Sequence, residues 1–201
     1  MRRDTTRTTR TRSVLATGLV GALMSVAGPT VAEAHSPRSD GWGQPVPLSK
    51  VLDGSTSQIQ AATFGIGNLK SGKFLQATST ANGAKVVQQK GSQANPLQNW
   101  VPVNDSPYTS FENASAGRNL GVDGASTASG AAAIIANGSG DANQDWLLVP
   151  VSGYPDGFFA MKNHKSGLCL GISGASTTNG AQAAQFKCDG SENQGWALFN
   201  H

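Results

Sequence analysis

The chain repeats one pattern three times from about residue 60 onward. The triplet Gln-x-Trp recurs at residues 98–100, 144–146 and 194–196, at spacings of 46 and 50 residues. Ahead of each triplet come an Asn, a Gly, a Leu and a Ser-Thr-x-x-Gly-Ala segment in constant order. The single residues are Asn68, Gly72 and Leu75, then Asn113, Gly117 and Leu120, then Asn163, Gly167 and Leu170. Five shared landmarks define three repeats, at about 60–104, 105–153 and 154–201.

Each repeat has the pattern of four short strands. In repeat one these are the alternating Phe64-x-Ile66, a strand ending at Leu75, Val86-Val87 and Val101-Pro102-Val103. Polar segments rich in Gly, Ser and Asn separate the strands, and no stretch has the length and period of a helix. We therefore predict an all-β domain. The matching strands are 109–111, a strand ending at Leu120, 134–135 and 147–149, then 159–161, a strand ending at Leu170, 184–186 and 197–199.

Three copies favour a closed barrel over the other repeat architectures. Propellers need about four to eight blades, and open solenoids need atypical units at their ends. Closure of three four-stranded units removes the free strand edges in one step. We expect three pseudo-symmetric repeats around one shared core.

Three Gln-x-Trp copies at this period resemble the ricin-B-type β-trefoil lectins and the related xylan- and galactose-binding modules. The resemblance covers residues 60–201 and is strongest in repeat three, from Ser166-Gly167-Leu168-Cys169-Leu170 to Asn193-Gln194-Gly195-Trp196. It implies a β-trefoil fold and a carbohydrate-binding function. We interpret the triplets themselves as architectural, with Trp filling the core and Gln holding a loop, so they identify a fold better than a ligand. These residues are Gln98, Trp100, Gln144, Trp146, Gln194 and Trp196.

The N-terminal residues 1–34 have the order of a secretory signal peptide. An Arg-rich start precedes an apolar run from Val14 to Ala27, and Ala32-Glu33-Ala34 offers a cleavage site after Ala34. The run is shorter than the roughly 20 residues of a membrane span, so we expect a secreted protein without membrane insertion. Residues 35–59 are expected to be a partly ordered leader, although Val46, Leu48, Val51 and Leu52 could lie on the domain.

Removing the signal peptide leaves a formally neutral protein. The whole chain has 15 Lys+Arg and 12 Asp+Glu, and the peptide takes five Arg, one Asp and one Glu with it. No basic stripe remains for nucleic acid. Charged residues make up 13% of the chain, against about 25% in typical domains. Such a surface suits a neutral polar partner, and we expect a monomer.

Two cysteines, Cys169 and Cys188, remain after cleavage. An even number in an exported chain favours a disulfide, whereas two buried free thiols are the alternative. The resemblance implies the disulfide, because its intra-repeat bridge falls on these positions. Closing a loop of this length would add about 3 kcal/mol.

The resemblance also implies where a sugar would bind. The family uses an Asp after Cys-Leu, an aromatic residue on the third strand, a polar residue past the second Cys and the Asn before Gln-x-Trp. An aromatic face covers the apolar side of a pyranose, while Asp and Asn bind its hydroxyls. These positions fall on Gly171, Phe186, Asp189 and Asn193 in repeat three, on Gly121, Ala136, Ser139 and Asn143 in repeat two, and on Gln76, Lys90, Gln93 and Leu97 in repeat one.

The family Asp is missing from every repeat, because Gln76, Gly121 and Gly171 stand in its place. Asp123, two residues on, either reaches the same space or caps the turn at Gly124. We therefore predict sugar binding in repeat three, a weaker case in repeat two and none in repeat one. A single shallow site would bind with an affinity near millimolar, about −4 kcal/mol.

Other functions receive less support from the sequence. No hydrolase, metalloprotease or phosphate-binding motif occurs, and His164 is expected to be a solvated loop residue. We expect no enzyme activity, cofactor or metal. The alternatives are a protein-binding trefoil, such as a protease inhibitor that presents the turns 105–108 and 154–157, or a scaffold without a ligand.

Overall fold

The computed structural model describes residues 42–52 and 62–200 of the chain. The expected signal peptide and the leader segments 35–41 and 53–59 lie outside the described residues. The prediction of four strands per repeat is confirmed, and the shared Leu residues do not end the second strands, which run two residues further. The strands are β1 Phe64–Asn68, β2 Phe74–Ala77, β3 Val86–Gln89, β4 Trp100–Asp105, β5 Tyr108–Asn113, β6 Arg118–Val122, β7 Ala133–Asn137, β8 Trp146–Val149, β9 Phe159–Asn163, β10 Cys169–Ile172, β11 Ala183–Phe186 and β12 Gly195–Asn200.

Helical structure in the described residues is short. The α-helix α1 spans Leu48–Leu52. The repeats contain only three-residue 3₁₀ turns, several of which lead directly into the Gln-x-Trp strands. They are η1 Pro96–Gln98, η2 Asp123–Ala125, η3 Ala142–Gln144, η4 Ser173–Ala175 and η5 Glu192–Gln194.

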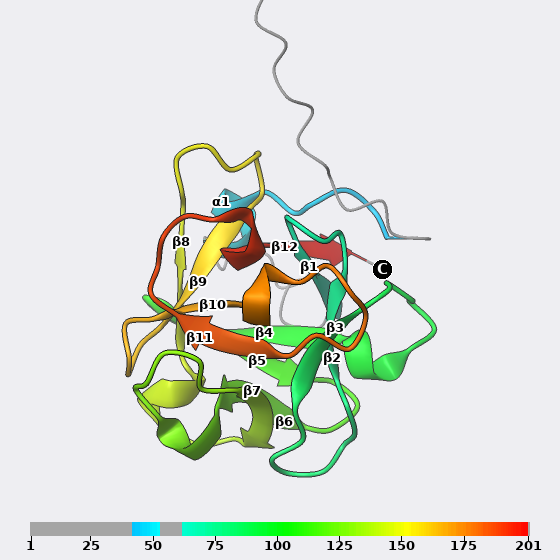
Figure 1. Ribbon diagram of the computed structural model, residues 1–201. Helices are drawn as coiled ribbons and strands as arrows, with labels where there is room; N and C mark the ends of the chain where they lie inside the picture. The colour runs from blue at the N-terminus through cyan, green and yellow to red at the C-terminus, as the bar shows by residue number, and fades with distance from the viewer. Residues whose placement is uncertain (1–41, 53–61, 201) are drawn as a thin grey trace, which may run out of the picture. The chain divides into compact units, whose positions relative to one another are not determined.

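Six strands close into a barrel in the order β1-β4-β5-β8-β9-β12 (Figure 1). The first and last strands complete the ring, because β1 and β12 pair antiparallel over five residues, from Phe64↔Asn200 to Asn68↔Trp196. The other six strands form three hairpins, β2–β3, β6–β7 and β10–β11. This arrangement of a closed barrel and three hairpins is the β-trefoil that the repeats predict.

The three hairpins interlock through their glycine-bearing loops. The N–H of Gly83 donates to Ile135, that of Gly130 to Gln185 and that of Gly180 to Gln88, with N···O distances of 2.7–2.8 Å. Each of these glycines has a positive φ between 79° and 88°, a conformation that side chains with a Cβ disfavour. Every repeat therefore depends on a neighbouring repeat for part of its backbone hydrogen bonding.

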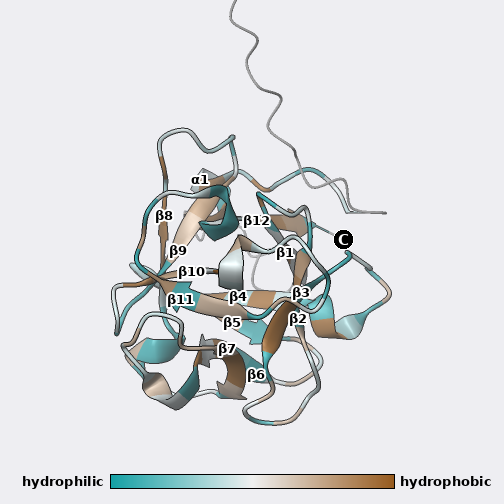
Figure 2. Ribbon diagram, in the orientation of Figure 1, coloured by the Kyte–Doolittle hydropathy of each residue, from teal (hydrophilic) through white to brown (hydrophobic). Residues whose placement is uncertain are grey.

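The three motif tryptophans fill the core, as expected. Trp100, Trp146 and Trp196 are fully buried, and each indole N–H donates to the carbonyl of the shared Leu of its own repeat at 2.9–3.1 Å. In Figure 2 apolar stretches lie on strands such as β2, while the loops are mostly pale or teal. One apolar body and one satisfied N–H per repeat explain why Trp recurs.

The described part of the leader packs against the domain. Val51 of α1 is fully buried in the main core, and the Val46 N–H donates to the Leu198 carbonyl at 2.8 Å. Trp42 stacks on Phe74 with a centroid distance of 4.8 Å. Residues 42–52 are thus an integral element of the fold. Among the described residues no helix is long and apolar enough to cross a bilayer.

Candidate functional site

The predicted site residues of repeat three gather around Gly171. This glycine lies on β10, and a Cβ added to it would lie 3.3 Å from both Asn193 Nδ2 and Phe186 Cδ2. Phe186 ends β11 opposite Cys169, and Asn193 lies in η5 just before the Gln-x-Trp strand. Both side chains are partly exposed. The position of the missing carboxylate therefore borders an aromatic ring and an amide.

Asp189 joins this group through Ser191, a residue that the sequence reasoning missed. Ser191 Oγ lies 2.6 Å from Asp189 Oδ1 and 2.7 Å from Asn193 Oδ1. The Ser191 N–H also donates to Asp189 Oδ1 at 2.9 Å. These hydrogen bonds, the hydroxyl first and the amide second, lower the pKa of Asp189. The sequence Asp189-Gly190-Ser191 is the signal that marks Ser191, because an Asp side chain often accepts the backbone N–H two residues further on in an Asx turn.

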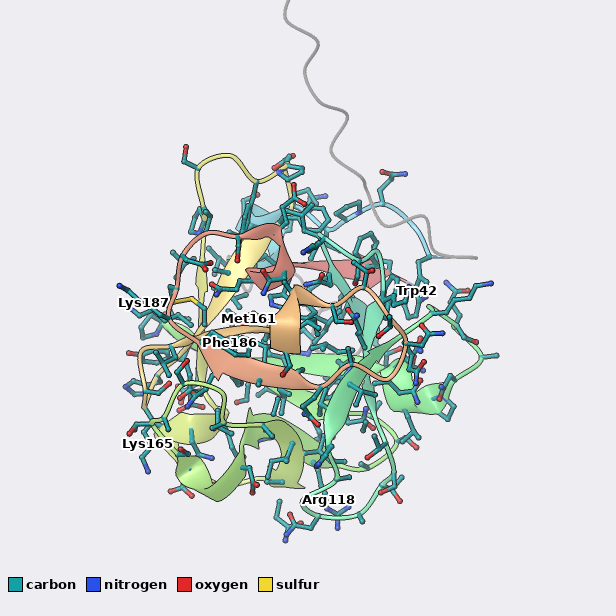
Figure 3. All side chains as sticks on the ribbon, viewed as in Figure 1. Trp42, Arg118, Met161, Lys165, Phe186 and Lys187 are labelled. Carbon is teal, nitrogen blue, oxygen red and sulfur yellow. A yellow bond between two sulfur atoms is a disulfide. The ribbon has the colours of Figure 1, made fainter. Side chains whose placement is uncertain are left out.

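Gln194 and the disulfide hold the loop that carries Asp189. Gln194 Oε1 accepts from the Asp189 N–H at 3.3 Å, and Gln194 Nε2 donates to the Lys187 carbonyl at 2.9 Å. Cys169 and Cys188 form the expected disulfide between β10 and the same loop. The predicted architectural role of the motif glutamine is thereby confirmed, because its amide bridges two loop residues. Figure 3 shows Phe186 and Lys187 at the end of this hairpin.

Repeat two has the same backbone frame with fewer binding groups. A Cβ added to Gly121 would lie 3.5 Å from Asn143 Nδ2. Ala136 occupies the register of Phe186 and provides no aromatic ring. Asn143 is buried and donates to the Val122 carbonyl at 3.4 Å. Ser139 donates to Asp141 at 2.9 Å, which uses its hydroxyl hydrogen.

Asp123 stands at the start of η2 with an exposed side chain. Its carbonyl accepts from the Ser126 N–H at 3.1 Å, so its backbone closes the turn at Gly124. A role of Asp123 in sugar binding remains a prediction.

In repeat one, two of the four carried-over positions, Lys90 and Gln93, were wrong by one residue. The strand register places Gln89, not Lys90, opposite Phe74, as Phe186 lies opposite Cys169. The N–H of Ser92, not Gln93, donates to the motif glutamine, as the N–H of Asp189 does.

An amide cluster occupies the position of the family Asp in repeat one. Gln76 Oε1 accepts from Asn95 Nδ2 at 2.8 Å and from Gln98 Nε2 at 3.0 Å. Leu97, which replaces the site Asn, packs against the core. The acceptor of Gln76 is therefore engaged twice within the protein, and Leu97 has no polar side-chain group. No cluster of three His, Cys, Asp or Glu side chains in the described part of the chain could hold a metal ion.

Comparisons with known proteins agree with this geometry. The family model described as ricin-type beta-trefoil lectin domain-like matches residues 51–136, 96–155 and 142–201. None of the curated protein sequences matches the chain.

Among solved structures, the chain is similar to ThreeFoil, a designed 3-fold symmetric protein. The identity is 32% and the TM-score 0.65, over 69% of this chain and 99% of that one. An exo-beta-1,3-galactanase from Clostridium thermocellum shares 26% identity with a TM-score of 0.65, over 70% of this chain and 30% of the enzyme. The Macrolepiota procera ricin B-like lectin in complex with lactose has 19% identity and a TM-score of 0.60, over 69% of this chain and 95% of that lectin, which shows a shared fold.

The family model matches three overlapping segments that together run from residue 51 to residue 201. The closed barrel, the three hairpins and the three buried tryptophans agree with this match. Membership supports carbohydrate binding as the general function. The chain belongs to the family of ricin-type β-trefoil lectin domains.

Proposed function

We propose that this protein is a secreted lectin without enzyme activity that binds a neutral glycan, galactose- or xylose-containing, through repeat three. The observation that carries the proposal is the gathering of Phe186, Asp189 and Asn193 around Gly171. The ring offers an apolar face to a pyranose, and the ionised Asp189 accepts hydrogen bonds from hydroxyls. Near-neutral overall charge after signal cleavage favours an uncharged ligand.

The loss of the family Asp limits the expected affinity. Gly171 carries no carboxylate, and a Cβ added to it would lie 3.0 Å from Gln194 Cγ, so neighbouring side chains already crowd this position. The Asp189–Ser191–Asn193 chain is left to supply the polar contacts. We expect weak monovalent binding, with a dissociation constant near millimolar. Repeat two offers Asn143 and Asp123 without an aromatic platform, and it is the weaker candidate.

A glycan array with site variants tests this proposal. Phe186→Ala and Asn193→Ala should each weaken binding at least tenfold, because one removes the platform and the other a polar contact. Asn143→Ala and Ser139→Ala in repeat two are the matched controls and should leave most of the binding intact. Binding that survives both repeat-three changes would eliminate repeat three as the site.

Export is the second part of the proposal. The disulfide suits an oxidising compartment, and the N-terminal sequence predicts cleavage after Ala34. N-terminal sequencing of protein from the culture medium should therefore begin at His35. Retention of the intact N-terminus inside the cell would contradict this part and leave sugar binding untouched.

A further inference from the structure

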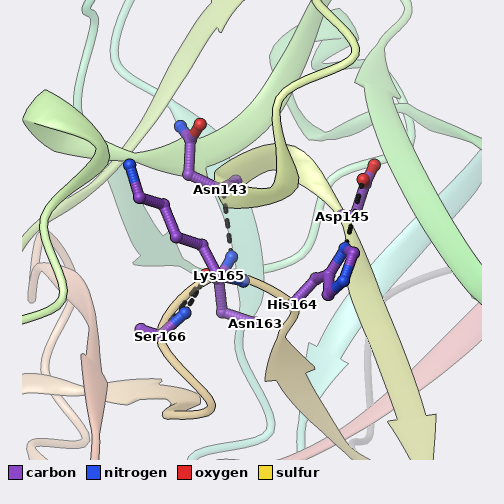
Figure 4. A network of polar contacts seen from close by, with 6 residues as sticks. All are labelled: Asn143, Asp145, Asn163, His164, Lys165 and Ser166. Carbon is purple, nitrogen blue, oxygen red and sulfur yellow. Dashed lines mark hydrogen bonds and ion pairs between the residues drawn. The ribbon is translucent and has the colours of Figure 1, made fainter.

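Tyr108 and His164 form an aromatic pair where repeats two and three meet. Their ring centroids lie 3.8 Å apart and their planes differ by 17°. His164 Nδ1 lies 3.7 Å from Asp145 Oδ2, and the two side chains are 41% and 20% exposed. His164 lies in a turn with an exposed side chain, as the sequence predicted, and it also contacts an aromatic ring and a carboxylate. Figure 4 shows the imidazole beside the carboxylate, with Lys165 extending away on the other side of the turn.

The turn that carries His164 is firmly held. The His164 N–H donates to the Asp145 carbonyl at 2.9 Å. The buried Asn163 donates to the Asn143 carbonyl at 3.0 Å and accepts from the Ser166 N–H at 3.2 Å. The backbone that carries the imidazole is consequently held in place before any ligand arrives, which lowers the entropic cost of binding.

The other two junctions between repeats show that the fold does not require this aromatic pair. The backbone bond from His164 to Asp145 has equivalents from Leu69 to Gly195 and from Ala114 to Asn99, each at 2.9 Å. At the junction with the bond from Leu69 to Gly195, Phe158 is the equivalent of Tyr108. Leu69 and Phe158 are each 4% exposed and belong to a second core cluster.

At the junction with the bond from Ala114 to Asn99, Thr63 and Ala114 are the equivalents of Tyr108 and His164, and neither carries a ring. Small residues thus close one junction, and buried apolar residues close the other. Among the described junctions, the one between repeats two and three is where an aromatic pair stays accessible beside a carboxylate. An arrangement that folding does not demand is a candidate for ligand binding.

We propose that Tyr108, His164 and Asp145 form a second carbohydrate subsite, for a neutral pyranoside, apart from the hairpin site of repeat three. The outer ring face supports the apolar C–H side of a sugar, as aromatic surfaces do in lectin sites. Asp145 offers carboxylate oxygens to two hydroxyls, and His164 Nε2 offers one further donor or acceptor. This inference rests on the proposed function, since it assumes a sugar-binding protein.

The test is an NMR titration of the exported chain with lactose and, separately, with xylobiose. Signals of Tyr108 and His164 should move with sugar concentration. In Tyr108→Ala and in Asp145→Asn, binding at these signals should weaken at least tenfold. Phe186→Ala, which removes the platform of repeat three, is the control and should leave them unchanged. Asp145→Asn keeps the side-chain shape and decides the outcome alone if Tyr108→Ala does not fold.

Three results would overturn the subsite. If only signals around Gly171 and Asn193 move, the subsite is refuted and the proposed function stands. If Phe186→Ala abolishes the shifts at Tyr108 and His164, those shifts report the repeat-three site at a distance. If no signal moves with either sugar, while the glycan array is also negative, both proposals fail together.

Discussion

Gln182 lies where the three repeats meet, and its Nε2 is within hydrogen-bonding distance of one carbonyl from each repeat. This nitrogen lies 2.8 Å from the Val86 carbonyl, 3.0 Å from that of Ala133 and 2.7 Å from that of Ala183. The three carbonyls occupy equivalent positions, one in each repeat. A single side-chain amide therefore contacts carbonyl acceptors on strands that are far apart in sequence. Lys85 and Ala132, which stand at the position of Gln182 in repeats one and two, have no side-chain amide.

Gln182→Ala should lower the free energy of unfolding by about 1–3 kcal/mol, because buried carbonyls lose their donor. Gln182→Glu should cost more, since a carboxylate would face three carbonyl oxygens. Lys85→Ala is the matched control at an exposed equivalent position and should stay within about 0.5 kcal/mol of the wild type. Denaturant unfolding measures all three. A neutral Gln182→Ala would mean that water replaces the amide without loss.

Tyr154 is held in its neutral form. Its hydroxyl donates to the Ser191 carbonyl at 2.8 Å. Burial, followed by the charges of Asp189 and Glu192, raises the pKa of Tyr154 to about 12. Because the folded pKa lies above the unfolded value of 10.0, the corresponding stability is complete below pH 10 and is lost as the pH rises towards 12.

Ultraviolet titration of Tyr108→Phe, in which Tyr154 is the remaining one of two tyrosines, should give a phenol midpoint near 12. Asp189→Asn combined with Glu192→Gln should lower this midpoint partly, because burial, the larger cause, is unchanged. A midpoint at 10 in the folded protein would contradict the buried, hydrogen-bonded phenol.

At the scale of elements, α1 shows how an N-terminal segment becomes part of the core. Val51 is fully buried, whereas Leu52 next to it is 49% exposed. Asn104 of β4 donates to the Val51 carbonyl at 3.2 Å. The helix is five residues long, too short to be stable without the barrel against which it packs.

Val51→Ala should reduce the free energy of unfolding by about 1–3 kcal/mol through lost burial and a small cavity. Leu52→Ala provides the comparison at an exposed neighbour and should change it by less than about 0.5 kcal/mol. Thermal or denaturant unfolding of both variants gives the difference. Equal effects at the two positions would show that α1 does not pack as described.

The sequence predicted the strands better than the leader and the site. Alternating residues such as Phe64-x-Ile66 identify a strand locally, and three copies confirm the pattern. The burial of Val51 depends on tertiary contacts, which the sequence of a five-residue segment does not predict. In repeat one, six positions separate Ser92 from Gln98, whereas five separate Asp189 from Gln194. Repeat one therefore has one additional residue in this loop. Counting back from Gln-x-Trp ignores it, so the alignment selected Lys90 and Gln93 in place of Gln89 and Ser92.

At the scale of the whole molecule, no repeat can complete its own hydrogen bonding. Gln88 Nε2 donates to the carbonyls of Ser176 and Thr178, and Gln185 Nε2 donates to those of Ser126 and Ala128. Repeat one thus holds a loop of repeat three, and repeat three holds the matching loop of repeat two. The pairing of β12 with β1 then closes the barrel, so the three repeats depend on one another.

This mutual dependence predicts a single cooperative unfolding transition. Tryptophan fluorescence reports the three core indoles, one per repeat, together with Trp42 of the N-terminal segment. Far-ultraviolet circular dichroism reports the strands of all repeats. The two signals should change at the same denaturant concentration, as in a two-state transition. A chain ending at residue 153 lacks β9 to β12 and leaves the edges of β1 and β8 unpaired, so it should stay unfolded or aggregate. Separated transitions, or a native-like two-repeat fragment, would mean that the repeats are stable units and that closure only joins them.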